Sequence, residues 1–472
     1  MKRWILLLAL GPGLLGAGPG APDPVAEVDA QHERALRLSR ALFDYSELGY
    51  RERRSAALLR DELAAAGFAL ETGVAGLPTA FVASVGRGRP VIALLAEFDA
   101  LPGLSQAALP VRSPRADVDA AHACGHNLFG AGSTVAAIAA ARWLAASGAP
   151  GTLRLYGTPA EEGGSGKVYL ARAGRFDDVD AVLHWHPSDR NDASPVSNLA
   201  NKSAKFRFHG VASHAAVAPE RGRSALDGVE AMDHMVNLLR EHVPEATRIH
   251  YVITRGGEAP NVVPAEAEVF YYVRHPEPAV LEQIWQRVEA AAEGAALGTG
   301  TRVDHEVIHG NHSLLPNDTL ARVMDESLHR VGGPVWDDEA REFAERLRES
   351  LPPDSPPLTA AFGLEPFAPR LWKASTDVGD VSWVAPTVGL KVATWVPGTA
   401  AHSWQAAAAS GSPVGEAGML VAARALALTA AALFQDPAAL AEARAEFERR
   451  RGPDFHYRPL LGDRDPPLDY RR

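Results

Sequence analysis

The sequence predicts an α/β protein of two domains, in which a small ferredoxin-like domain is inserted into a larger one. Three observations predict this. The chain has 472 residues, which is more than one ordinary hydrophobic core holds. Up to about residue 200, apolar strand-like runs alternate with helical stretches, which indicates a parallel or mixed sheet covered on both faces. Over residues 201–312 the order becomes β-α-β-β-α-β, written βαββαβ.

The first part of the larger domain, residues 24–200, is expected to begin with a helical region that stops at Gly67. Hydrophobic periodicity runs from Val25 to Ala66. The strand Pro90–Ala96 is almost wholly apolar and is therefore expected at the centre of the sheet. The other elements predicted here are the strands Thr79–Val85, Thr152–Thr158 and Asp180–His186, and the helices Gly132–Ala146 and Gly166–Ala173.

The inserted domain is followed by a second part of the larger domain, residues 313–436. The insertion is built from the predicted strands Ala204–Val211, Arg248–Thr254, Ala267–Arg274 and Arg302–Ile308 and the helices Ser224–His242 and Pro278–Leu297. The second part contains the predicted helix Thr319–Val331, the strand Leu390–Trp395 and the helix Gly415–Phe434. Residues 335–372 are interpreted as a peripheral elaboration, and residues 437–472 as a charged C-terminal tail, more an arm than part of the core.

Residues 1–21 are predicted to be a cleaved secretory signal peptide. Lys2 and Arg3 give a charged start, Trp4–Leu10 is apolar, and small residues follow. The alternative is a retained membrane anchor, but this apolar run is too short to span a bilayer and is broken by Gly11-Pro12-Gly13. No later segment is predicted to be long and apolar enough to cross a membrane. We therefore expect an exported protein, periplasmic or secreted, without stable membrane insertion.

The overall charge and the cysteine content narrow the class further. The net charge of −11 comes from 47 basic and 58 acidic residues, which argues against a nucleic-acid partner because such binding needs a basic face. Cys124 is the only cysteine, so an internal disulfide is excluded. This residue is then either buried and inert or used as a ligand.

The segment His122–Asn127, with the sequence His-Ala-Cys-Gly-His-Asn, carries the strongest chemical signal. It follows a predicted strand and precedes a predicted helix. A lone histidine is more often an ordinary polar core residue. Three potential nitrogen and sulfur ligands within five residues favour a site for a transition metal such as zinc.

Two acidic segments also follow predicted buried strands. Glu97 and Asp99 are two residues apart and share one face at the carboxyl end of a strand, where open sheets place active sites. The alternative for this pair is an exposed acidic turn. Glu161 and Glu162 are adjacent, and a cation with a division of labour would resolve their repulsion: one binds metal and the other acts as a general base.

Histidines complete the candidate set. His184 and His186 share a face of the predicted strand that Pro187 ends, and one of the two is expected to be a ligand while the other supports the site. His402 lies in a loop of small residues after the last predicted strand, which alone would be weak evidence.

These motifs together resemble a known family. Residues 96–103, the His-Ala-Cys-Gly-His-Asn segment, Pro159–Glu162, Trp185–Pro187 and His402–Trp404 are similar, in this order, to the aminoacylase/carboxypeptidase-type metallopeptidases of clan MH, in the branch of aminobenzoyl-glutamate hydrolases and dipeptidases. The resemblance implies a three-layer, zinc-exopeptidase-like catalytic domain in which the inserted domain is a lid and dimerisation domain.

The resemblance also implies roles for individual residues. Two divalent metal ions, Zn or Mn, would be bound by Cys124, His126, Glu162, His186 and His402, with Cys124 shared. Glu161 would be the general base for a metal-bridging water. Asp99 and Glu97 would orient the ligands without binding the ions. In many relatives a histidine ligand stands at the position of Glu97, and here Asn127 replaces a frequent aspartate.

The same resemblance assigns residues of the inserted domain. His214 would reach the active site of the partner subunit in a homodimer. Asn261 and Arg274 would grip the carboxylate of the substrate, and a guanidinium suits a planar carboxylate because it donates two parallel hydrogen bonds. Without the resemblance, His214 and Arg274 would be interpreted as surface residues of a small sandwich.

The sequence thus predicts a metal-dependent amidohydrolase that cleaves N-acyl or N-aminoacyl amino acids, with aminobenzoyl-glutamate-like or dipeptide substrates that carry a carboxylate. Two alternatives belong to other classes. One is a non-catalytic ligand-binding homologue, although no motif residue has been lost. The other is a hydrolase with Cys124 as nucleophile and His126 as base, although two residues of spacing fit co-ligation better.

Overall fold

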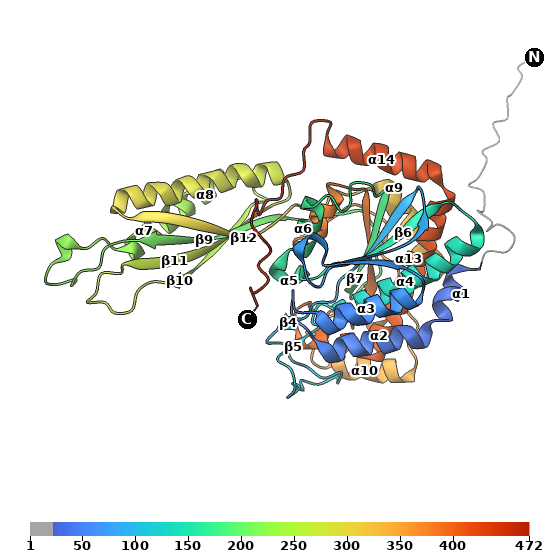
Figure 1. The fold of residues 1–472 in the computed structure, drawn as a ribbon. Helices are drawn as coiled ribbons and strands as arrows, with labels where there is room; N and C mark the ends of the chain where they lie inside the picture. The colour runs from blue at the N-terminus through green and yellow to red at the C-terminus, as the bar shows by residue number, and fades with distance from the viewer. Residues whose placement is uncertain (1–21, 472) are drawn as a thin grey trace, which may run out of the picture.

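The computed structural model describes residues 22–471, so the predicted signal peptide at residues 1–21 lies outside the described part of the chain. The fold has two bodies, a larger catalytic domain and a lid that projects from it (Figure 1). A six-stranded sheet organises the catalytic domain and a four-stranded sheet organises the lid. This architecture confirms the predicted α/β fold with an inserted domain.

The sheet of the catalytic domain is mixed, with the strand order β1-β2-β6-β3-β7-β14. The four strands from β6 to β14 run parallel, and β1 and β2 join antiparallel at one edge. The parallel strands are β3 (Val91–Ala96), β6 (Gly151–Gly157), β7 (Ala181–Ser188) and β14 (Thr387–Ala393), and the antiparallel ones are β1 (Ala69–Thr72) and β2 (Phe81–Arg87). The parallel arrangement brings the carboxyl ends of β3, β6 and β7 to one edge.

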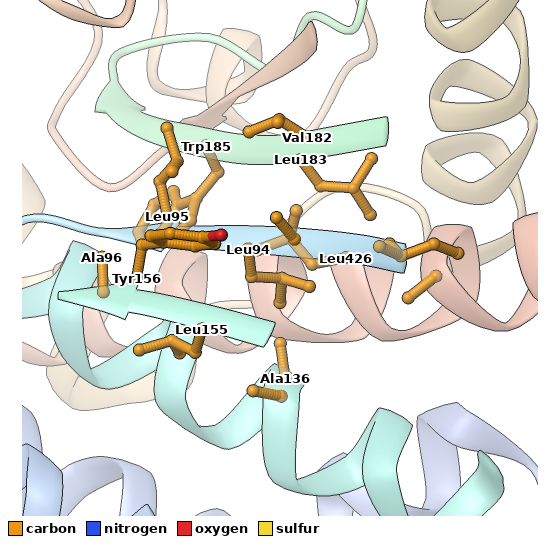
Figure 2. Packing of buried hydrophobic residues seen from close by; sticks show 14 of the residues in the cluster. Leu94, Leu95, Ala96, Ala136, Leu155, Tyr156, Val182, Leu183, Trp185 and Leu426 are labelled. Carbon is orange, nitrogen blue, oxygen red and sulfur yellow. The ribbon is translucent and has the colours of Figure 1, made fainter. Parts of the chain in front are cut away.

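Two long alanine-rich helices, α4 (His126–Ser147) and α13 (Pro413–Gln435), pack on each other and against the central strands. All six residues of β3 are buried, as the apolar run predicted. Figure 2 shows Ala136 of α4 and Leu426 of α13 close to Leu94 and Leu155 of the sheet. This core fixes the sheet edge from which the candidate site is built.

One expectation about these helices was wrong. Both α4 and α13 are long and apolar enough to cross a membrane by length and composition. However, 89% and 83% of their most apolar windows are buried inside the protein. Their hydrophobicity is therefore that of core helices, which pack against other protein on all sides.

Shorter elements surround the sheet. The predicted helical region Val25–Ala66 divides into three helices, because Ser46 adopts a left-handed conformation that ends the second of them. The helices are α1 (Pro24–Asp29), α2 (His32–Tyr45), α3 (Arg53–Ala65), α5 (Glu161–Gly164), α6 (Gly166–Arg172), α9 (Asp318–Val331), α10 (Asp338–Arg348), α11 (Val378–Ser382) and α12 (Trp404–Ser410). Two short ladders pair β4 (Leu101–Pro102) with β5 (Ala120–Ala121) and β8 (Val196–Ser197) with β13 (Arg370–Leu371).

The lid is a ferredoxin-like sandwich with its own core. Its antiparallel sheet has the order β10-β11-β9-β12, and two helices cover it. Phe206, Tyr271 and Trp285 are buried between the layers. The elements are β9 (Ala200–His209), α7 (Ala225–Leu239), β10 (Arg248–Arg255), β11 (Glu266–His275), α8 (Pro278–Thr299) and β12 (Arg302–Asn311).

The C-terminal segment is part of the fold, so the interpretation of residues 437–472 as an arm was wrong. Helix α14 (Pro437–Arg451) buries Leu440 and Phe447 against the catalytic domain. The chain then runs between the two bodies, where Leu460 joins the core of the lid and Leu461 that of the catalytic domain. The charged residues of this segment concealed its few apolar anchors, and the partners of these anchors are distant in sequence.

Candidate active site and metal centre

The predicted site residues of the catalytic domain meet at the carboxyl edge of the sheet. Glu97 and Asp99 follow β3, Glu161 and Glu162 follow β6, and His186 lies in β7. Cys124 and His126 enter from the start of α4, and His402 from the loop before α12. Most of these residues line a cavity of about 460 Å³. The structure therefore brings into one place segments that the sequence separates by nearly three hundred residues.

Cys124, His126 and His186 form a first group of potential metal ligands. One donor atom of each lies within 4.8 Å of the others. Cys124 Sγ is 3.4 Å from His186 Nε2. His126 donates from Nδ1 to Asp99 Oδ1 at 3.0 Å, and His186 donates from Nδ1 to the carbonyl of Pro187 at 2.7 Å. These bonds leave both Nε2 atoms facing the group, as a metal-binding histidine requires.

Cys124, Glu162 and His402 form a second group with the same spacing, so Cys124 belongs to both. His402 Nε2 lies 3.3 Å from Glu162 Oε1. Glu97, His126 and Glu161 make a third group on the inner side. The five residues predicted as ligands thus occur in two adjacent triads with one shared thiol.

The chemistry of these groups fits bound cations. Among the described residues, Glu97 Oε2, His126 Nε2 and Glu162 Oε1 are buried here without a hydrogen-bond partner. Unpartnered buried polar atoms are costly, and a cation would satisfy all three. Burial, reinforced by the charge of Glu162, raises the pKa of the Cys124 thiol. A thiolate at this position therefore needs a positive partner, and thiolate, imidazole and carboxylate together suit zinc or a similar ion.

The raised pKa of Cys124 bears on the alternative in which this residue is a nucleophile. Reactive cysteines have lowered pKa values and lie in electropositive surroundings. Here the neighbouring groups include Glu162, and the side chain is only 8% exposed. Burial, together with the charge of His126, lowers the pKa of His186 to about 4, which keeps that imidazole neutral and able to ligate.

Local backbone geometry places the ligands. Gly125 has φ +76°, and a Cβ there would lie 2.7 Å from the ring of Pro187, so only glycine fits between Cys124 and His126. Ala160 adopts φ +57° before the adjacent glutamates. Its N–H donates to the buried carboxylate of Glu52 at 2.8 Å, and the N–H of Glu162 donates to Asp99 at 2.9 Å. Asp99 therefore positions both His126 and Glu162.

Two residues near the C-terminal end support the same loop from behind. The carbonyl oxygen of Glu162 accepts a hydrogen bond from the hydroxyl of Tyr470 at 3.2 Å and another from the guanidinium of Arg471. The Tyr470 ring meets the edge of Tyr50, whose hydroxyl donates to the carbonyl of Gly164 at 2.6 Å. Sequence reasoning missed both residues, because nothing in a charged tail points to a partner so far upstream.

Lys167 is a buried cation that sequence reasoning also missed. Its Nζ lies 2.7 Å from Glu97 and 2.7 Å from Asp377, and all three side chains are buried. Burial alone would raise the pKa of Glu97, but the charges of Lys167 and His126 lower it below its usual range. Glu97 therefore remains ionised, with one oxygen held by Lys167 and the other 3.1 Å from His126 Nε2. A lysine in an otherwise apolar short helix was the only signal in the sequence.

Glu161 lies at the cavity wall beside the ligand groups. No hydrogen bond ties its carboxylate to the part of the chain that the structure describes. Burial, reinforced by the charges of Glu97 and Glu162, raises its pKa well above the usual value. A free carboxylate with a raised proton affinity has the properties of a general base.

The other two histidines singled out in the sequence do not join the ligand groups. His122 is buried and its Nε2 donates to the carbonyl of Leu42 at 3.0 Å. Burial lowers its pKa to about 3. His184 lines the inner part of the cavity, one strand pair below His186.

The predicted lid residues lie apart from this site within one chain. His214 and Asn261 are exposed, Arg274 is half-buried, and none of the three lines the cavity. His214 is in the loop between β9 and α7, which lies at the end of the lid away from the catalytic domain (Figure 1). Arg274 has a buried Nε without a partner and its guanidinium lies over the ring of Tyr272. A single chain therefore does not bring these residues to the metal ligands.

Comparison with known proteins places this arrangement in a family. Residues 197–299 match the family model described as a peptidase dimerisation domain. The chain is 40% identical to one of the two subunits of the p-aminobenzoyl-glutamate hydrolase of Escherichia coli over 449 residues, covering 89% of this chain and 93% of the relative. It is 33% identical to the Xaa-Arg dipeptidase of Mus musculus, covering 89% and 90%.

Solved structures agree in fold. A dinuclear metal-binding peptidase of the M20 family from Bacillus subtilis has a TM-score of 0.59 at 20% identity, covering 86% of this chain and 99% of that one. An aminobenzoyl-glutamate utilization protein from Klebsiella pneumoniae has a TM-score of 0.60 at 19% identity, covering 86% and 97%. With relatives above 30% identity along most of its length, the chain belongs to the M20 peptidase family of hydrolases, the aminoacylase/carboxypeptidase-type family that its motifs resemble.

Proposed function

We propose that the protein is a metal-dependent amidohydrolase that cleaves the amide bond of N-acyl or N-aminoacyl amino acids. The observation that carries the proposal is the pair of ligand triads that share Cys124, with the free carboxylate of Glu161 beside them. Cys124, His126, Glu162, His186 and His402 would hold two divalent ions, Zn or Mn. When bound, these ions supply a Lewis acid for the amide carbonyl and lower the pKa of water.

The residues of the chain would divide the remaining work. Glu161 takes the proton of the attacking water and returns it to the leaving amine, which its raised proton affinity favours. Asp99 holds the ring of His126 and the backbone of Glu162 in place. The cavity walls exclude bulk water and so strengthen the electrostatic interactions inside.

The substrate class follows from what the relatives share. The names of these relatives specify aminobenzoyl-glutamate in one case and a dipeptide ending in arginine in the other. Both contain an amide nitrogen that belongs to an amino acid with a free carboxylate. We extend this class to the present chain, with Arg274 and Asn261 of the lid as the groups that bind that carboxylate.

Export is part of the proposal and rests on the sequence of residues 1–21, with its charged start and apolar run. The mature enzyme would then work in the periplasm or outside the cell. Cys124, without a partner for a disulfide, remains available there as a ligand.

Turnover of a defined substrate panel tests the function. We expect the purified enzyme to hydrolyse aminobenzoyl-glutamate or members of a dipeptide panel, and to lose activity with a chelator and regain it with Zn²⁺ or Mn²⁺. Amidation of the substrate carboxylate should raise KM, because a charge-assisted hydrogen bond is lost. Activity that persists after complete metal removal would contradict the proposal, as would the absence of turnover with the whole panel.

Mixing two inactive variants tests whether the lid serves a partner subunit. The exposed position of His214, outside the cavity of its own chain, supports a role in the partner's site of a homodimer. In a heterodimer of His214→Ala and Glu161→Gln chains, one of the two sites would have both groups intact. We therefore expect mixing to restore up to about half of the activity per heterodimer. A mixture that exchanges subunits and stays inactive would place both groups in one chain.

A further inference from the structure

The cavity extends beyond the metal ligands along the edge strand β14, and Lys391 lies in this extension. In the parallel pairing of β7 and β14, Lys391 is the direct neighbour of His186. Paired residues on adjacent strands are about 4.8 Å apart and point to the same face of the sheet. Lys391 therefore lies beside the ligand group, on the side away from Glu161 and Glu162, and both Lys391 and His186 line the cavity.

Lys391 has no anionic partner in the part of the chain that the structure describes. It is the only lysine or arginine among the residues that line the cavity. The nearest candidate carboxylate, Asp192, already accepts from Arg370 at 2.6 Å and from the N–H of Ser194 at 2.8 Å. No ion pair or hydrogen bond of Lys391 Nζ occurs within residues 22–471. A half-buried ammonium group without a counter-charge is unfavourable until an anion joins it.

The surroundings of Lys391 favour a ligand that has an apolar body and a charged end. Its Nζ lies 4.4 Å from the centre of the Trp372 ring. Trp395, Leu314 and Val196 contribute further apolar wall, and the ring centre of Trp372 is 6.5 Å from that of His186. An aromatic or aliphatic group that starts at the metal ligands would thus run along apolar surface and end at the ammonium group.

We propose that Lys391 and Trp372 form a subsite for the acyl part of the substrate, and that this subsite selects acyl groups whose far end carries a carboxylate. The proposal rests on the amidohydrolase function and defines its substrate class more closely. The carboxylate of the released amino acid is a separate group, assigned above to the lid. Preferred substrates would therefore carry two carboxylates, one on each side of the scissile amide.

Three glutamates that differ only in the acyl group test the subsite. They are N-(4-carboxybenzoyl)-glutamate, N-benzoyl-glutamate and N-(4-aminomethylbenzoyl)-glutamate, assayed with the metal-loaded enzyme. We expect the wild type to favour the carboxybenzoyl compound, and Lys391→Gln to lower the ratio of its kcat/KM to that of the benzoyl compound by about tenfold or more. Lys391→Glu should shift the preference to the aminomethyl compound, and Lys391→Arg should keep the carboxyl preference.

Lys373→Gln is the matched control. It removes the same charge next to Trp372, but Lys373 is exposed and does not line the cavity. We expect this variant to keep the wild-type ratio. The subsite is overturned if the wild type does not favour the carboxybenzoyl compound, if Lys391→Gln leaves the ratio unchanged or changes all three substrates by one factor, or if Lys373→Gln lowers the ratio equally.

A binding measurement separates failure of the subsite from failure of the proposed function. If no enzyme form hydrolyses any of the three compounds, the amidohydrolase proposal fails, whereas the subsite is still tested by titration with terephthalate and benzoate. Stronger binding of terephthalate that is lost by about tenfold in Lys391→Gln supports the subsite. Equal binding of the two acids to the wild type, or equal loss of both in the variant, rejects it.

Discussion

Replacement of Glu161 by glutamine is expected to lower kcat by about 10²–10⁴-fold, the range typical for loss of a general base. The substitution keeps the size of the side chain and removes its ability to accept a proton. Metal content, measured on the purified protein by elemental analysis, should remain that of the wild type, because Glu161 is outside the two triads that share Cys124. KM should change far less than kcat.

Glu162→Gln provides the comparison for this experiment. Glu162 belongs to the second triad and lies 3.3 Å from His402, so its substitution should lower metal content as well as turnover. If metal is missing from Glu161→Gln and complete in Glu162→Gln, the roles of the two adjacent glutamates are reversed.

Substitution of Cys124 by serine is expected to reduce the content of both metal ions and to abolish most activity. Cys124 is common to both triads, so its loss removes one donor from each. A serine hydroxyl is a poorer ligand than a thiolate for zinc-like ions. Metal that binds only the folded state stabilises it by about 4 kcal/mol at a thousandfold excess over Kd, so Tm should fall with the metal content.

His122→Gln is the control for Cys124→Ser, because His122 is in the same segment and buried but belongs to neither triad. This variant should lower Tm through the loss of its hydrogen bond to Leu42, while its metal content stays that of the wild type. Full metal content in Cys124→Ser would contradict the proposed coordination.

The order of elements could be predicted from the sequence more accurately than their limits. Helix α4 begins at His126, six residues before the predicted start at Gly132, because its first turn carries metal-ligand chemistry instead of periodic apolar residues. Strand β9 begins at Ala200 and not at Ala204, because its first residues, Asn201 to Ser203, are polar. Periodicity reports burial of side chains, and it fails where a segment is kept for other reasons.

The candidate ligands were predictable because each lies at a strand or helix end where the chain emerges at one edge of a parallel sheet. Lys167 and Asp377 were not, since their partnership spans 210 positions and neither residue stands in a motif. The same holds for Lys391, whose significance comes from its register with His186 and from the absence of a carboxylate partner among the described residues. Such pairings are set by tertiary structure and leave no local trace.

The hydrogen bonds from Tyr470 and Arg471 to Glu162 have a consequence for biosynthesis. These two residues follow Glu162 by 308 and 309 positions. The ribosome makes them long after it has made the loop that they hold, so a nascent chain can form the sheet before the loop has its last two supports. Completion of the metal centre is therefore tied to the finished polypeptide, and a chain truncated late in translation would retain most of its fold but lack these two supports of its ligand loop.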